Sequence, residues 1–253
     1  MNFLNTVFKF GAVFGCLCTA WAFAKTEKHQ VIPINSETVE LPIPDGKPIT
    51  IELKVTDGDI NIRVGDRKTA VLVIDEFESD EYANIEYDTS DSILEIKLSA
   101  HLARSDIELT LPQNTNLSLR AEDGDVHIVG IHGEINVKTI DGDLTMKDVV
   151  GPITAECTDG NIFASILSPN ALQPISLATV DGNIKLRIHP QASLDIAAAT
   201  LDGDFEYDID ILSKKFKQRG DATFIEGTIN SGGPRISLRS VDGNISIKEI
   251  PTN

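Results

Sequence analysis

Residues 139–162 read TIDGDLTMKDVVGPITAECTDGNI, a stretch in which the tripeptide Asp-Gly-Asp/Asn occurs at Asp141 and again 18 residues later at Asp159. Glycine falls every nine residues from Gly124 to Gly160, and the tripeptide occurs at every second one of these glycines. The repeating unit is therefore a coil of two nine-residue halves, each a short strand and a turn. Seven copies of the tripeptide begin at Asp57, Asp123, Asp141, Asp159, Asp181, Asp202 and Asp242.

Apolar residues alternate with other residues on both sides of each tripeptide, a pattern typical of half-buried strands. No helical periodicity occurs in residues 46–253. We therefore predict an all-β fold, a β-solenoid (β-helix- or roll-like) of stacked two-strand coils, each strand pairing with its counterpart one coil on. The coils span 18 residues at first and up to 22 later. The predicted inward positions are Leu117, Leu119, Val126, Ile128, Ile135, Val137, Leu144, Met146, Ile153, Ala155, Ile162, Ala164, Ile175, Leu177, Ile184, Leu186, Ile196, Ala198, Phe205, Tyr207, Ile236, Leu238, Ile245 and Ile247.

The chain divides into a signal peptide (1–24), a lead segment (25–45) and a β-strand-repeat domain (46–253). Residues 46–122 are expected to hold a first coil and a β-meander with a hairpin turn at Thr89–Ser92, and residues 123–253 the regular coils. The meander caps the first coil, because an open terminal coil would template aggregation. Asp202 and Asp242 lie 40 residues apart, so an insertion is expected near 208–226.

The first 24 residues have the features of a secretory signal. Lys9 is their only charge, and Ala22-Phe23-Ala24 forms an A-x-A cleavage site. The apolar run from Phe10 has about 15 residues, short of the roughly 20 that a membrane-spanning helix needs. We expect export to the periplasm or the cell surface without a stable membrane span. A lipid on Cys16, after Val13-Phe14-Gly15, is the alternative.

The charge balance argues against a nucleic-acid partner. Lys and Arg total 22 against 39 Asp and Glu, which gives a formal net charge of −17. Loss of Lys9 with the signal peptide would make it −18. Such a surface repels polyanions. Removal of Cys16 and Cys18 leaves Cys157 as the lone thiol, in a column of small residues beside the corner, where we expect it to be buried.

The row of acidic tripeptides raises the question of metal binding. Gly accepts positive φ, and Asp or Asn can bond nearby backbone amides, so the tripeptide is turn chemistry. Calcium-binding rolls have several glycines per nine residues, whereas each half here has one, and alternate halves lack the acid pair. We predict no metal ligand and no cofactor. A Ca²⁺-stabilised roll stays as an alternative, because stacked carboxylates repel one another unless they are hydrogen-bonded or screened.

No catalytic motif accompanies the repeat. The five histidines are scattered, and neither a metal-binding pair, a nucleophile elbow nor a phosphate loop occurs. We predict no catalytic residue. The residues expected to point outward are mixed and mostly small, and Phe163 is the only aromatic among them. They are Asn136, Lys138, Thr154, Glu156, Ser176, Ala178, Asp195, Ala197, Ser237 and Arg239 on one face, and Lys147, Lys185, Arg187 and Glu206 on the other.

Three stretches resemble the toastrack-type β-strand-repeat family of bacterial adhesin-like proteins. Residues 107–115 resemble its strand that ends in a Pro turn, residues 124–162 its nine-residue ladder, and residues 227–236 with 240–245 its closing coil. The family often has Ser-Gly-Asp at the corner, where this chain is more acidic. The resemblance covers about residues 38–250 and implies an envelope-associated or exported module. The family's defining domain has no assigned molecular function, so no catalytic residues are carried over.

We expect a non-enzymatic, exported envelope module, adhesin-like or acting in scaffolding or sensing. Its rigid strand face would bind an envelope protein or a polysaccharide. A carbohydrate-active β-helix enzyme, a lyase or a hydrolase, is the alternative from another class. A carboxylate pair or an Asp–Arg set on one strand face would favour it.

Overall fold

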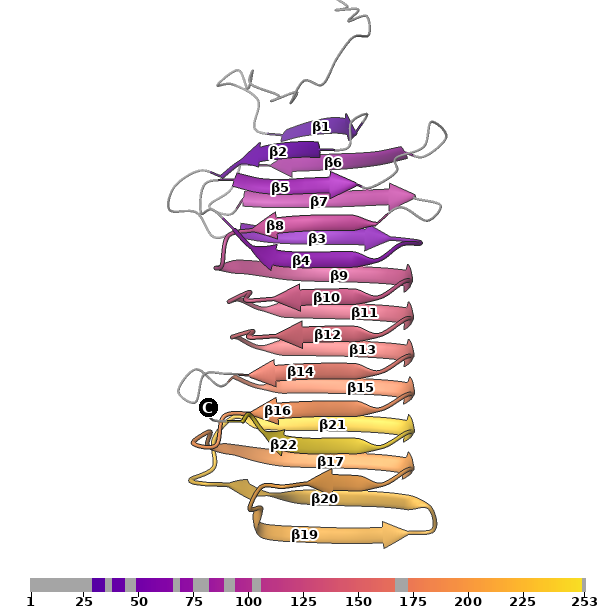
Figure 1. The fold of residues 1–253 in the computed structure, drawn as a ribbon, viewed down its shortest axis with the longest axis vertical. Coiled ribbons are helices and arrows are strands. Elements are labelled where there is room, and N and C mark those ends of the chain that lie inside the picture. The colour runs from indigo at the N-terminus through magenta and orange to yellow at the C-terminus, as the bar shows by residue number, and fades with distance from the viewer. Residues whose placement is uncertain are drawn as a thin grey trace, which may run out of the picture.

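The computed structural model describes residues 29–34, 38–43, 49–65, 69–74, 82–88, 94–101, 106–166 and 173–251. In these ranges every regular element is a strand, and the strands form two sheets along an elongated stack (Figure 1). No helix in these ranges has the length and apolar character needed to cross a membrane. The predicted signal peptide, with Cys16, and the predicted turn at Thr89–Ser92 lie outside the described residues.

Among the described residues, sheet A has twelve strands and sheet B has ten. In spatial order, sheet A consists of β1 (His29–Ile34), β6 (Tyr82–Asp88), β7 (Leu94–His101), β3 (Ile49–Val55), β9 (Thr115–Asp123), β11 (Ile135–Asp141), β13 (Ile153–Asp159), β15 (Ile175–Asp181), β21 (Arg235–Asp242), β17 (Leu194–Asp202), β20 (Ala222–Ile229) and β19 (Leu212–Arg219). Sheet B, in spatial order from the opposite end, consists of β18 (Phe205–Tyr207), β22 (Ile245–Glu249), β16 (Ile184–Ile188), β14 (Ile162–Ile166), β12 (Leu144–Lys147), β10 (Val126–Val129), β4 (Ile60–Val64), β8 (Ile107–Leu111), β5 (Thr69–Ile74) and β2 (Thr38–Pro42).

The coils stack in parallel, with each residue opposite its equivalent. Ile135 of β11 pairs with Leu117 of β9 on one side and with Ile153 of β13 on the other. All of the predicted inward positions except Phe205 and Tyr207 are buried, and they form one apolar core between the two sheets. Burial of each large aliphatic side chain contributes roughly 1.5–3 kcal/mol. The predicted β-solenoid is confirmed.

The corners of the coils bring backbone against backbone. Gly142 has φ +116°, and a Cβ placed on it would overlap the carbonyl oxygen of Gly124 in the coil before. Gly160 lies against Gly142 in the same way. The predicted corner is confirmed. Glycine is required there for two separate reasons, the positive φ and the absence of space for a side chain.

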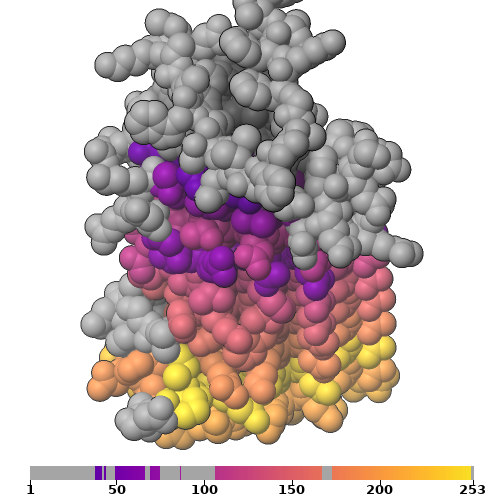
Figure 2. Space-filling view, turned by 45° about the horizontal axis from the view of Figure 1, so that its top comes forward, coloured from indigo at the N-terminus to yellow at the C-terminus, as the bar shows by residue number. Residues whose placement is uncertain are grey.

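The last coil is not at the end of the stack. β21 and β22 lie between the coil β15–β16 and the coil β17–β18, so that Asp242 pairs with both Asp181 and Asp202. In Figure 2 the yellow residues of this coil accordingly lie among orange ones. The prediction that each strand pairs with its counterpart one coil on is wrong here. The physical reason is that all coils carry similar inward residues, so any coil fits beside any other.

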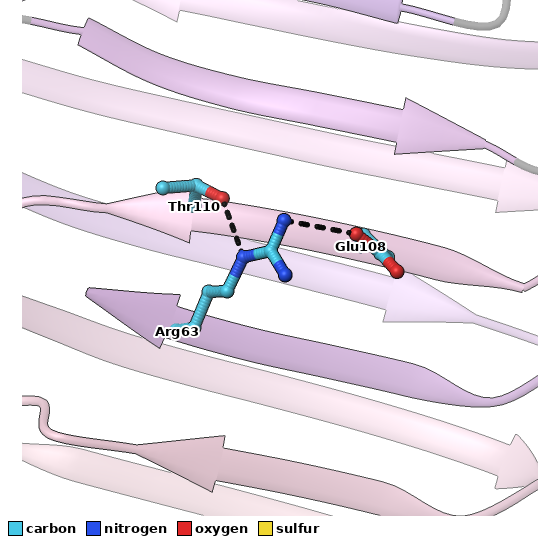
Figure 3. A network of polar contacts seen from close by, with 3 residues as sticks. All are labelled: Arg63, Glu108 and Thr110. Carbon is cyan, nitrogen blue, oxygen red and sulfur yellow. Dashed lines mark hydrogen bonds and ion pairs between the residues drawn. The ribbon is translucent and has the colours of Figure 1, made fainter. Parts of the chain in front are cut away.

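The first coil is inserted in the same manner at the other end. β3 and β4 lie between the coil β7–β8 and the coil β9–β10. Side chains on the outer face of sheet B join this coil to its neighbour (Figure 3). Arg63 of β4 donates from Nε to Thr110 Oγ1 at 3.2 Å, and one of its terminal nitrogens lies 3.1 Å from Glu108 Oε2.

Antiparallel strands cap both ends of the parallel stack. At the N-terminal end the cap is divided between the sheets, since β6 pairs with β1 and β7 while β5 pairs with β2 and β8. At the other end β20 pairs antiparallel with β17, and β19 pairs with β20. This hairpin occupies the interval that was expected to hold an insertion.

The end of sheet B differs from the sequence prediction. Phe205 and Tyr207 were predicted to point into the core, but Phe205 is only half-buried and Tyr207 is 38% exposed. Both residues belong to β18, which is the edge strand of sheet B. The edge position explains the exposure, because only β22 pairs with β18 within the described sheet B.

We expect Gly142→Val to lower the free energy of unfolding by about 2–6 kcal/mol, the sum of a strained φ and an overpacked contact. Thermal melts would measure this, since 1 kcal/mol corresponds to a shift in Tm of about 2–4 °C in a domain of this size. Gly220→Val is the matched control, because Gly220 has φ +64° and open space around its Cβ position. Equal losses in the two variants would show that the stacking contact at Gly142 contributes nothing.

Candidate functional site

The third residue of each acidic tripeptide joins its coil to the next. In six of the seven copies, its side-chain oxygen accepts a hydrogen bond from the backbone N–H of the equivalent residue in the next coil of the stack, and Asp204 takes part through its backbone N–H. At one end of this ladder, Asp106 Oδ1 accepts from Asp59 N at 3.0 Å. The Oδ1 atoms of Asp59, Asp125, Asp143, Asn161, Asn183 and Asn244 then accept, in order, from the backbone nitrogens of Asp125, Asp143, Asn161, Asn183, Asn244 and Asp204, at 2.7–2.9 Å.

The first Asp of each tripeptide has a different environment. Asp141 pairs in register with Asp123 and Asp159, and all three side chains are exposed. The corner is thus an acidic ridge whose repulsion is reduced by salt. Among the described residues, no group of three or more His, Cys, Asp or Glu side chains is placed to hold a metal ion. The ladder gives the carboxylates of Asp59, Asp125 and Asp143 a structural role as acceptors of backbone hydrogen bonds.

Cys157 lies in the column of small residues beside the corner, as predicted, and is 4% exposed. Its Sγ lies 3.5 Å from the carbonyl oxygen of Gly142, to which it donates a hydrogen bond. Burial raises the pKa of the Cys157 thiol, and the carboxylates of Asp143 and Asp159 raise it further. Thr179, the equivalent residue in the next coil, donates to Gly160 O at 3.0 Å. Cys157 therefore replaces a threonine as a corner donor.

The outer face of sheet B is held by contacts between its own side chains. The Arg187 guanidinium lies 5.8 Å from the centroid of the Phe163 ring. Lys248 Nζ lies 2.7 Å from Glu206 Oε1, and this hydrogen bond lowers the pKa of Glu206. Three of the residues predicted to point outward here, Phe163, Arg187 and Glu206, thus make contacts across coils.

The outer face of sheet A is different at its C-terminal end, where two grooves meet. The first has a volume of about 490 Å³, and Val180, Leu201 and Val241 on its wall are exposed apolar residues. The second has a volume of about 660 Å³. Both grooves are lined by Ala199, Phe224 and Arg239. Exposed apolar patches of this kind are typical of interaction sites.

The second groove is basic, although the protein as a whole is acidic. Five cations line it against a single carboxylate, Glu226, which lies 3.8 Å from Arg235. Its floor is made of small residues, among them Ala197, Ala199 and Ser237. The five cations are Lys215, Lys217, Arg219, Arg235 and Arg239.

Sequence reasoning named part of this groove and missed the rest. Ala197, Ser237 and Arg239 were predicted to point outward, and they line it. Phe224 and the three cations of β19 were missed, because residues 208–226 were treated as an irregular insertion. The signal that could have found them is the alternation of Lys215, Lys217 and Arg219, which has the period of a strand.

One Asp–Arg pair lies on this face. Asp195 of β17 is opposite Arg235 of β21. Asp195 Oδ1 accepts a hydrogen bond from Thr228 Oγ1 at 2.9 Å, and Arg235 lies near Glu226. Neighbouring side chains therefore contact both members of the pair.

The Toastrack DUF4097 family profile matches residues 13–248. The chain belongs to this family. A crystal structure of a "putative cell adhesion protein" from Clostridium sporogenes is similar, with 14% identity, a TM-score of 0.50, and coverage of 84% of this chain and 99% of that one. A "putative adhesin" from Bacteroides fragilis has 15% identity and a TM-score of 0.29, covering 87% and 97%. None of the curated proteins matches the chain.

We expect Asp143→Ala to lower the free energy of unfolding by about 1 kcal/mol, because the backbone N–H of Asn161 loses its acceptor. Asp143→Asn keeps an acceptor oxygen and should stay within about 0.5 kcal/mol of the wild type. Asp141→Ala, at an exposed corner position, is the control. Chemical denaturation measures all three. A loss in Asp143→Asn as large as that in Asp143→Ala would show that the charge, rather than the acceptor, stabilises the corner.

We expect thermal melts in millimolar Ca²⁺ and in EDTA to agree within about 1 °C, because the Oδ1 atom of each ladder carboxylate already accepts a backbone N–H. A ligand present at about 100 times its Kd would add roughly 2.7 kcal/mol, which a melt detects easily. A rise specific to Ca²⁺ over Mg²⁺ would contradict the structural interpretation and favour a calcium-stabilised roll.

Proposed function

We propose that the protein is an exported, non-enzymatic binding module of the bacterial envelope, adhesin-like in character. It holds a polymer or protein partner against the outer face of sheet A at the C-terminal end of the stack. The basic and apolar groove bounded by the β19–β20 hairpin is the observation that carries this proposal. Export rests on the predicted signal peptide, residues 1–24.

The groove has the properties of a binding surface. Its floor of alanine and serine has short side chains, so a partner can approach the backbone closely, and Phe224, 45% exposed, offers apolar contact area. The side chains of Lys215, Lys217 and Arg239 make no ion pair or hydrogen bond with another described residue. Cations free of internal partners, beside an exposed aromatic ring, favour an anionic partner with some apolar character.

The fold supports this function. The strands that line the groove pair in defined registers, β21 with β17 in parallel and β17 with β20 and β20 with β19 antiparallel. The side chains that line the groove therefore have fixed separations. The Clostridium sporogenes protein of similar fold is described as a "putative cell adhesion protein", which agrees with a role in attachment. The Asp195–Arg235 pair is the one observation that favours the carbohydrate-active alternative.

We expect Arg239→Glu to weaken binding to immobilised alginate and polyglutamate about tenfold, because a carboxylate then faces the anionic partner. Ala199→Phe should weaken it similarly by filling the floor at unchanged charge. Biolayer interferometry, with neutral dextran as a blank, measures both variants.

Thr154→Phe is the matched control, since Thr154 is an exposed residue on the same face of sheet A outside both grooves. Unchanged binding in Ala199→Phe and Arg239→Glu would refute this site. Release of reducing sugar from envelope polysaccharide by the wild-type protein would favour the carbohydrate-active enzyme instead.

A further inference from the structure

The strand β19 ends sheet A. It pairs with β20 on one side, and no other described strand lies on its second side (Figure 1). A row of backbone N–H and C=O groups is therefore available there, and such an edge can accept a further strand. All eight residues of β19 are exposed.

The outward face of β19 is basic. Lys215, Lys217 and Arg219 pair across the hairpin with Glu226, Phe224 and Ala222, residues on the outer side of sheet A. Alternate residues of a strand are about 6.6–6.8 Å apart. Any extended peptide places alternate side chains at the same interval. Carboxylates at every second position of an added strand would therefore each lie opposite one cation of β19, at cross-strand contact distance.

The opposite face of β19 has an exposed aromatic ring. Phe216 pairs with Ile225, which is buried on the inner side of β20, yet Phe216 itself is 55% exposed. Sheet B ends at β18, whose Tyr207 Oη accepts a hydrogen bond from Lys214 Nζ at 2.6 Å. β18 therefore contacts only the start of β19, and the Phe216 ring is left largely exposed. An added strand with apolar residues between its carboxylates would cover the Phe216 ring.

We propose that β19 accepts an extended segment of a partner protein as a further strand of sheet A, and that this segment alternates acidic with apolar residues. The inference rests on the proposed function, since Lys215, Lys217 and Arg219 also line the basic groove. The register of β19 against β20 is irregular between Leu212 and Lys215. The pairing segment is therefore short and lies opposite residues 215–219.

A second copy of the chain fits this edge poorly. β19 against β19 would place cations opposite cations. β1, the other end strand of sheet A, reads HQVIPI and has no carboxylate to offer. Lysine and an irregular register on an edge strand are devices that prevent pairing with like strands. The same lysines attract an acidic strand. The edge of β19 therefore disfavours pairing with a like strand and favours pairing with an acidic one.

The test uses the protein and short capped peptides in fluorescence anisotropy. We expect a peptide of alternating glutamate and valine to bind at least about tenfold more tightly than a block peptide of the same composition or an alternating lysine–valine peptide.

Lys215→Glu/Lys217→Glu should abolish that preference. Arg120→Glu/Lys147→Glu, which changes the charge equally at exposed positions remote from β19, should preserve it. Phe216→Ser should weaken binding about fivefold, through lost apolar contact. Melting curves check that each variant is folded.

N-methylation of the peptide separates strand addition from simple charge attraction. Only one edge of an added strand donates hydrogen bonds to β19, so methylating alternate amides on that edge should abolish binding, while methylating the other set should preserve it. If both methylated peptides bind, or if the block peptide or alginate binds equally well, the strand-addition inference is overturned while the groove remains a binding site. If no anionic probe binds at all, the proposed function fails as well.

Discussion

The structure depends on the close approach of backbone to backbone at its corners. Each corner glycine lies over the carbonyl oxygen of the corner glycine in an adjacent coil of the stack, with no space for a side chain between them. This contact fixes the separation and the register of neighbouring coils at one point. The apolar columns then align of necessity, because every coil has the same two-residue period on both sides of its corner. The Asp and Asn oxygens of the ladder accept hydrogen bonds from the backbone at the same corner. The close backbone contact and the hydrogen bonds between coils therefore occur at one place.

A stack of interchangeable coils does not by itself determine their order in space. The coil of β21 and β22 is inserted one place from the C-terminal end of the stack, and the coil of β3 and β4 one place from the other end of the parallel region. Each inserted coil ties a terminal part of the chain between two coils that follow each other in the sequence. The coils beyond them are then covered by antiparallel strands, which end the parallel ladder in a way that further parallel coils could not. The repeat therefore forms a scaffold, and its ends hold the irregular strands.

The features of the fold that depend on short-range periodicity could be predicted from the sequence. The buried columns, the positive φ at the corner and the burial of Cys157 all follow from alternation and from the residue types beside each glycine. The order of the coils could not be predicted, because pairing partners are chosen among nearly equivalent strands. Tyr207 fits the apolar column but lies on an edge strand, and only the three-dimensional order shows that. The acids of the corner were recognised as turn residues, yet their acceptors serve the next coil, a contact between residues 18 or more positions apart.

Negative and positive side chains lie at different places on the outer face of sheet A. Their separation restricts the orientation of a bound ligand. The corner of sheet A is a ridge of exposed aspartates, next to the apolar residues Val180, Val241 and Leu201. The cations lie farther along the same face, on β21 and on the terminal strand β19. An anionic partner is thus repelled from the corner and attracted toward the end of the sheet, and fields of opposite sign on one surface orient a ligand as well as attract it. The repeat repels such a partner along the ridge, and the capping hairpin of β19 and β20, which breaks the repeat at this end of the sheet, is the place that we propose for its binding.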